Sequence, residues 1–209
     1  MKKVIIRKFD FRHINFLKTL EISIILIPLF LITGPFLSDL ALSYCSLGVL
    51  FYLKDKRLKK YFYSKFFLFF LIFWVFVLIA SFFAYDPILS LKNSIFYFRF
   101  GLFCICFAYL IEKDENLLKK LFLSISICFI ALILDGIFQY NFGYNIFGLE
   151  IIQNTRVSSF FGDELILGSY LSRFFPLLVG LHFFYFSKKN AVYELLLIFY
   201  LFFTMIAVL

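Results

Sequence analysis

The chain has 209 residues, of which 63% are hydrophobic and only 16% are charged. A soluble globular protein is nearer half apolar and a quarter charged, so this composition excludes an ordinary soluble domain. The net charge of +8 does not indicate a nucleic-acid partner, because the cationic residues lie in short clusters between apolar runs, as in the loops of membrane proteins.

Several apolar runs are close to 20 residues long. They predict an all-α fold, a polytopic transmembrane helical bundle of about seven spans that forms a single domain over residues 1–209. The first run, about 20–53, would be ~50 Å long as one helix, which is too long for a ~30 Å hydrocarbon core. Thr33-Gly34-Pro35 divides it into a hairpin, and Ser38 or Asp39 is the expected N-cap of the second helix.

The remaining spans alternate with polar segments. They are expected at residues 66–84, 95–111, 121–140, 167–186 and 191–209. Short loops are expected around Asp86, Pro87 and Lys92 and at residues 112–120, and one long external loop at about 141–164. This loop, together with its flanks from Asp135 to Arg173, is the one long polar interval in the chain.

The distribution of cationic residues predicts the orientation. Most of the 21 Lys and Arg residues fall in the N-terminal tail and in residues 54–65, 112–120 and 188–189. Cytoplasmic loops carry such an excess, so the N-terminus is expected in the cytoplasm. The basic N-terminus lacks a small-residue cleavage site, which favours a retained span over a signal peptide. Because Leu209 ends an apolar run, we expect the sequence to be part of a longer protein.

Polar side chains inside the spans are candidates for a site, because an ionisable group there costs at least ~2.5–3.5 kcal/mol. Arg99, Asp135 and Arg173 all lie in the outer halves of their predicted spans. Asp135 and Gln139 are spaced i, i+4 and share a helix face, as do Ser169 and Arg173. We expect a polar cavity between the fourth, fifth and sixth spans that binds an anion through arginines. The alternative is structural, with Asp135 paired to Arg99 or Arg173.

Asp163 and Glu164 lie just before the sixth span. They either cap that helix or contact a ligand or acceptor. The sequence contains no Gly-rich phosphate loop and no His/Cys cluster, so we expect no metal and no cofactor.

One motif is distinctive. Residues 156–164 read Arg-Val-Ser-Ser-Phe-Phe-Gly-Asp-Glu, and Gly168-Ser169-Tyr170-Leu171 and Pro176 follow. With the preceding Asp135–Tyr140 segment and its Gly/Asn-rich loop, this motif resembles bacterial O-antigen ligases and O-antigen polymerases. These are integral-membrane glycosyltransferases of the cell envelope. Residues 33–39 resemble their first hairpin, and the resemblance is sharpest over residues 135–176.

The resemblance implies a reaction at the outer face of the bacterial inner membrane. A glycan carried on undecaprenyl diphosphate passes to lipid A–core or to another glycan, without a nucleotide sugar or a known metal. It implies that Arg156 engages the diphosphate. Arg99, Arg173, Asp135, Gln139 and Asp163 are further candidates for substrate binding, chosen from their depth and charge. No catalytic residue is assigned.

Two features of the family lie beyond the region compared: a further arginine, and a large external loop whose histidine is proposed to activate the acceptor. Enzymatic activity of these 209 residues alone is therefore uncertain. The alternatives are a transporter or lipid-binding subunit for an anionic solute, or an inactive truncated product. The apolar inner halves of the fourth to sixth spans count against a transporter. The sequence does not separate ligase from polymerase.

Overall fold

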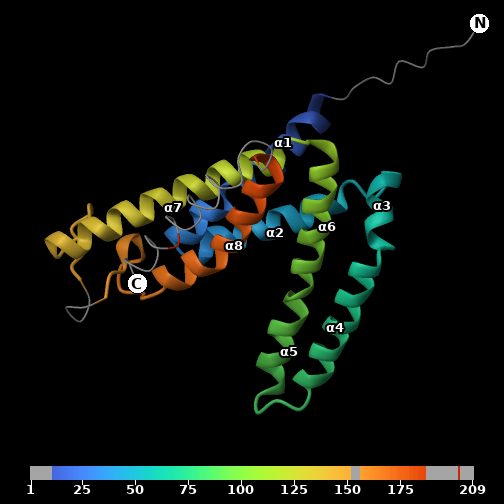
Figure 1. The fold of residues 1–209 in the computed structure, drawn as a ribbon. Helices are drawn as coiled ribbons and strands as arrows, with labels where there is room; N and C mark the ends of the chain where they lie inside the picture. The colour runs from blue at the N-terminus through green and yellow to red at the C-terminus, as the bar shows by residue number, and fades with distance from the viewer. Residues whose placement is uncertain (1–10, 152–155, 187–201, 203–209) are drawn as a thin grey trace, which may run out of the picture. The chain divides into compact units, whose positions relative to one another are not determined.

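The structure is a computed structural model that describes residues 11–151, 156–186 and 202. This part of the chain is helical and contains no β-strand, so the all-α prediction is confirmed for it (Figure 1). In chain order the elements are α1 (Phe11–Thr33), α2 (Pro35–Leu50), α3 (Lys56–Phe62), α4 (Lys65–Ser81), α5 (Pro87–Phe96), α6 (Phe98–Lys113), α7 (Leu117–Phe142), the 3-10 helix η1 (Ser159–Phe161) and α8 (Leu167–Phe186).

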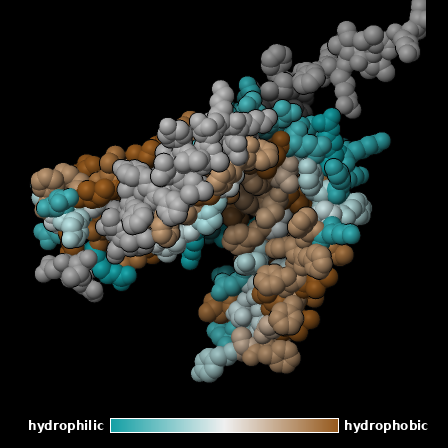
Figure 2. All heavy atoms as spheres, in the orientation of Figure 1, coloured by the Kyte–Doolittle hydropathy of each residue, from teal (hydrophilic) through white to brown (hydrophobic). Residues whose placement is uncertain are grey.

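Three segments of the described chain are long and apolar enough to cross a membrane, namely Phe16–Thr33, Pro87–Lys113 and Leu117–Phe142. A fourth is added if α3 and α4, which are bent by 49° at their junction, count as one broken span. Many large hydrophobic side chains of α4 are exposed, including those of Phe66, Phe69 and Phe76. Such a continuous apolar face is unfavourable in water and suits contact with lipid, and brown, hydrophobic residues dominate this helix in Figure 2.

Three predicted spans are not among these segments. The second corresponds to α2, which is apolar but has only 16 residues. The segment predicted as the sixth span forms helix α8 with the expected bounds, but it is not among the helices that are long and apolar enough to cross a membrane. The seventh, at residues 191–209, lies outside the described residues except for Phe202.

The predicted break between the first two helices is confirmed. Gly34 has a φ of 124°, which favours glycine, and α2 begins directly afterwards at Pro35. The predicted N-cap is wrong, because the helix starts before Ser38 and Asp39. The Ser38 hydroxyl instead donates to the Pro35 carbonyl at 2.9 Å.

The loops predicted between the later helices are shorter in the structure. Asp86 caps α5 by accepting a hydrogen bond from the Leu89 N–H at 3.1 Å, and Pro87 occupies the first turn. Lys92 therefore lies in a helix and not in a loop. The segment expected as loop at 112–120 is reduced to residues 114–116, because α6 extends to Lys113 and α7 begins at Leu117.

The chain divides into two compact units. Unit 1 comprises residues up to Ile24 and Asp39–Glu115, and unit 2 comprises Ile25–Ser38 and Asn116–Leu209. In unit 1, α4 packs against α5 and α6, and the Trp74 indole donates to the Ser94 carbonyl at 2.9 Å. In unit 2, α7 packs against α8 (Figure 1). The Tyr170 hydroxyl of α8 donates to the Pro28 carbonyl of α1 at 2.8 Å.

Candidate functional site

The C-terminal turns of α7 carry the two polar residues that the sequence placed on one helix face. Asp135 and Gln139 are both fully buried, which confirms their common face. The helix ends one turn later at Gly143, whose φ of 81° is the left-handed conformation common after a helix. The chain can therefore turn back and lie over these two side chains.

Gln139 joins two separate parts of the returning loop to the helix. Its side-chain oxygen accepts hydrogen bonds from the Ser158 N–H at 3.0 Å and the Ser159 N–H at 2.7 Å. Its side-chain nitrogen donates to the Leu149 carbonyl at 3.2 Å. One amide thus satisfies three backbone groups that have no partner in regular secondary structure.

Asp135 binds the same loop one turn earlier on α7. One carboxyl oxygen accepts from the Ile146 N–H at 3.0 Å, and the other accepts from the Ser159 hydroxyl at 2.6 Å. Ser159 has a φ of 52°, which is uncommon for a residue other than glycine. Its hydrogen bonds to Asp135 and Gln139 hold this conformation in place.

Asn145 stabilises the loop from within. Its side-chain oxygen accepts from the Phe147 and Leu149 N–H groups at 3.0 and 2.8 Å. Its side-chain nitrogen donates to the Ser159 carbonyl at 2.9 Å. We call Asp135, Gln139, Asn145, Ser158 and Ser159 the loop network; each of the five is 0% exposed.

The other charged candidates of unit 2, unlike Asp135, lie on the surface. Arg156, Asp163 and Arg173 are exposed. Arg156 precedes the buried Ser158 by two residues, so the loop network fixes the backbone next to it. Asp163 and Glu164 lie four and three positions before Leu167, the first residue of α8. Neither therefore occupies the N-cap position directly before that helix.

Arg99 belongs to unit 1 and has its own partners there. Its guanidinium forms an ion pair with Asp39 at 2.9 Å and donates to the Ser43 hydroxyl at 3.4 Å. The Asp39 carboxylate was missed as a partner because the sequence suggested it as a helix cap.

The alternative for Asp135 was an ion pair with Arg99 or Arg173. The contacts of Asp135 in the structure are different. Its two oxygens accept from a backbone N–H and a serine hydroxyl. Asp135 and Gln139 have no exposed surface, and their side chains bind the loop. In this structure they position the loop. Direct contact of either residue with a substrate stays a prediction.

Asn145 is the residue of this site that sequence reasoning missed, since the loop was recognised only as rich in Gly and Asn. The available signal was an Asn three residues before Gly148, which has a φ of 82°. Asn side chains bind backbone N–H groups two residues further on, and this spacing favours a compact turn.

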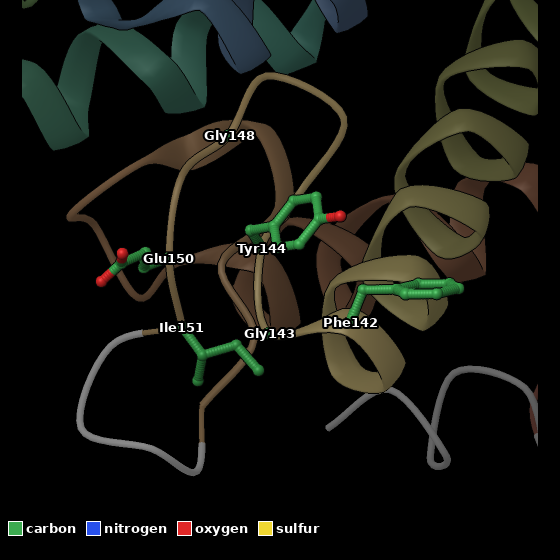
Figure 3. Close-up of a pocket in the computed structure, with 6 residues that line it drawn as sticks. All are labelled: Phe142, Gly143, Tyr144, Gly148, Glu150 and Ile151. Atoms are coloured by element: carbon green, nitrogen blue, oxygen red, sulfur yellow. The ribbon is translucent and has the colours of Figure 1, made fainter.

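A cavity of about 570 Å³ lies beside the loop and is lined by Phe142, Gly143, Tyr144, Gly148, Glu150 and Ile151. Figure 3 shows the Tyr144 hydroxyl and the Glu150 carboxylate pointing in opposite directions. Their polar groups therefore do not converge on one ligand position.

Comparison of the chain with protein-family models, with curated proteins and with solved structures gave no match.

Proposed function

We propose that this chain carries the donor-binding part of a membrane glycosyltransferase. The enzyme transfers a glycan from undecaprenyl diphosphate to lipid A–core or to another glycan, as O-antigen ligases and polymerases do. One observation carries the proposal. The segment that resembles this family, from Asp135 to the 156–164 motif, is tied together by hydrogen bonds that fix the chain next to an exposed Arg156.

Arg156 suits a diphosphate because its planar guanidinium can donate two parallel hydrogen bonds to phosphate oxygens. In the proposed reaction the acceptor hydroxyl oxygen bonds to the anomeric carbon while the bond from that carbon to the diphosphate breaks. The acceptor loses its proton, and the departing diphosphate gains negative charge. A fixed cation stabilises that charge without reorganising.

Arg173 and Asp163 are the other exposed candidates for substrate contact in unit 2. Arg99 has to release Asp39 before it can bind an anion with its full guanidinium. We therefore rank Arg156 and Arg173 above Arg99 as ligands of the donor.

The proposal includes a location and an orientation. The protein is a multi-pass protein of the bacterial inner membrane with a cytoplasmic N-terminus, about seven spans, and residues 141–164 outside. The three apolar segments support insertion in a membrane. The clustering of most Lys and Arg residues at 1–18, 54–65, 112–120 and 188–189 supports the orientation.

The first test is made in a cell that produces the full-length protein and its glycan. Arg156→Ala is expected to abolish surface glycan transfer, and Arg156→Lys is expected to retain part of it, because lysine keeps the charge and loses the fork. Gel ladders of the surface glycan measure transfer, and immunoblots measure the protein level. Lys119→Ala, which removes an exposed cation from the first turn of α7, is the matched control.

Unchanged ladders in Arg156→Ala would contradict the proposal. If purified protein in liposomes instead moved an anionic solute across the bilayer, the transporter alternative would be favoured.

A further inference from the structure

Unit 1 contains a second cavity, of about 540 Å³, lined by α3, α4 and α6. Phe66, Phe67 and Phe70 of α4 form one wall, and Cys104 and Ile105 of α6 lie opposite. Its volume is within the range of about 300–1,000 Å³ that is typical of small-molecule sites. Apart from Lys60 at one end, the lining residues are uncharged and mostly apolar, so the interior favours a hydrocarbon chain.

A bend between two helices and a close contact at a glycine shape this space. The axes of α3 and α4 differ by 49° at their junction, where Ser64 caps α4. Gly101 faces Phe70 so closely that even a Cβ atom at this position would collide with its ring. The Tyr61 hydroxyl of α3 donates a hydrogen bond to the Glu112 carboxylate of α6 at 2.7 Å. This bond holds α3 against α6 at one end of the cavity.

That end is strongly basic. Lys60 lines the cavity, and its ammonium group lies 5.9 Å from the centre of the Tyr61 ring. The neighbouring cations on or beside α3, all exposed, are Lys54, Lys56, Arg57, Lys59 and Lys65. Figure 2 shows hydrophilic residues gathered around α3 and hydrophobic residues along α4.

We propose that this cavity binds an anionic phospholipid, with an acyl chain between α4 and α6 and the phosphate headgroup at Lys60. An apolar interior with a cationic mouth matches both halves of such a lipid. Basic residues next to a membrane segment attract anionic headgroups. A zwitterionic lipid fits the same interior but gains less at the mouth, so the site selects for headgroup charge. This site is separate from the loop network and does not depend on the proposed glycan transfer.

Trp74 provides a local probe, because it is the single tryptophan of the chain. It lies one helical turn after Phe70 on α4 and therefore on the same face. Its ring is 4.9 Å from that of Phe98, which also contacts Phe70. Quenching of its fluorescence by bromine on an acyl chain reports lipid near the apolar end of the cavity.

The experiment reconstitutes the full protein in vesicles that contain acyl-brominated phosphatidylglycerol or equally brominated phosphatidylcholine. Wild-type protein is expected to prefer phosphatidylglycerol by at least about five-fold, the contribution of one lysine near the surface. The preference is expected to fall with added salt, because exposed charges are screened. Equal quenching by the two lipids would overturn the proposal.

Two variants locate the lipid. Lys60→Gln is expected to remove most of the preference, whereas Lys92→Gln, an exposed cation of α5, leaves it unchanged. Cys104→Phe fills the cavity and is expected to abolish the excess quenching by phosphatidylglycerol, whereas Ile127→Phe on an exposed position of α7 does not. If the preference survived both Lys60→Gln and Cys104→Phe, the anionic lipid would be bound elsewhere and the assignment would be wrong.

Discussion

At the scale of single residues, the Gln139 side chain makes three hydrogen bonds between α7 and the loop, one more than Asp135. The Gln139 side chain satisfies two N–H groups and one carbonyl, all within the buried loop network. A buried backbone group left without a partner costs about 1–3 kcal/mol. Loss of this amide is therefore expected to release the loop before it unfolds the helix.

Gln139→Leu tests this expectation. The variant keeps a side chain of similar size and leaves the Ser158 and Ser159 N–H groups without an acceptor. We expect a lower melting temperature in detergent and faster protease cleavage within residues 141–164. Tyr140→Leu replaces the exposed neighbouring residue by the same side chain and serves as the control. Equal effects of the two variants would show that Gln139 does not hold the loop.

The same residues show how far sequence reasoning reaches at this scale. The spacing of Asp135 and Gln139 predicted their common face, because that depends only on helix geometry. Their burial depends on Ser158 and Ser159, which lie 19 to 24 positions further along the chain. A local pattern contains no information about which loop residues return to a helix, so these two residues were expected to line a polar cavity.

At the scale of elements, the long helices followed from hydropathy and the short ones did not. α3 and α5 have only 7 and 10 residues. The start signals of α5 were present, since Asp86 is a favourable N-cap and Pro87 a favourable first residue. The charge of residues 54–65 and the polarity near Lys92 nevertheless suggested loops.

Asp55 gives α3 a measurable pH dependence. Its carboxylate accepts hydrogen bonds from the Arg57 N–H and the Tyr109 hydroxyl, both at 2.9 Å, and lies 3.4 Å from the Lys113 ammonium. The Arg57 N–H first, and then Tyr109 and Lys113, hold the pKa of Asp55 below its usual value of 3.8. An acid with a lowered pKa stabilises the fold above its unfolded pKa, and this stabilisation is lost as the pH falls through the folded value.

We therefore expect the melting temperature of the protein in detergent to fall below about pH 4 partly through this group. Asp55→Asn keeps a favourable helix cap and removes the charge, so the variant is expected to be less stable near neutral pH and less sensitive to acid. Thermal melting across that pH range compares the two proteins. Identical pH profiles for both proteins would contradict a role for Asp55.

At the scale of the whole molecule, composition and the apolar runs were sufficient to predict an all-α protein that is located in a membrane. In the part of the chain that it describes, the structure has three segments that could cross a membrane, or four with the bent pair, and the orientation remains a prediction from charge. The orientation is tested by cysteine labelling of intact spheroplasts that produce the protein with Cys104→Ser. Tyr85→Cys, between α4 and α5, should react with a membrane-impermeant maleimide from outside. Lys59→Cys on α3 should react only after permeabilisation; labelling of Lys59→Cys in intact spheroplasts would reverse the topology.

The central claim is that the loop network presents Arg156 to a lipid-linked diphosphate. The most direct measurement is binding of undecaprenyl diphosphate to the purified full-length protein, with undecaprenyl monophosphate as the comparison. A hydrogen bond to a charged group contributes about 1.5–3 kcal/mol, so Arg156→Ala is expected to weaken binding about 10- to 100-fold. Lys119→Ala should leave the affinity unchanged. If Arg156→Ala bound the diphosphate as tightly as the wild type, the account of this site would be wrong.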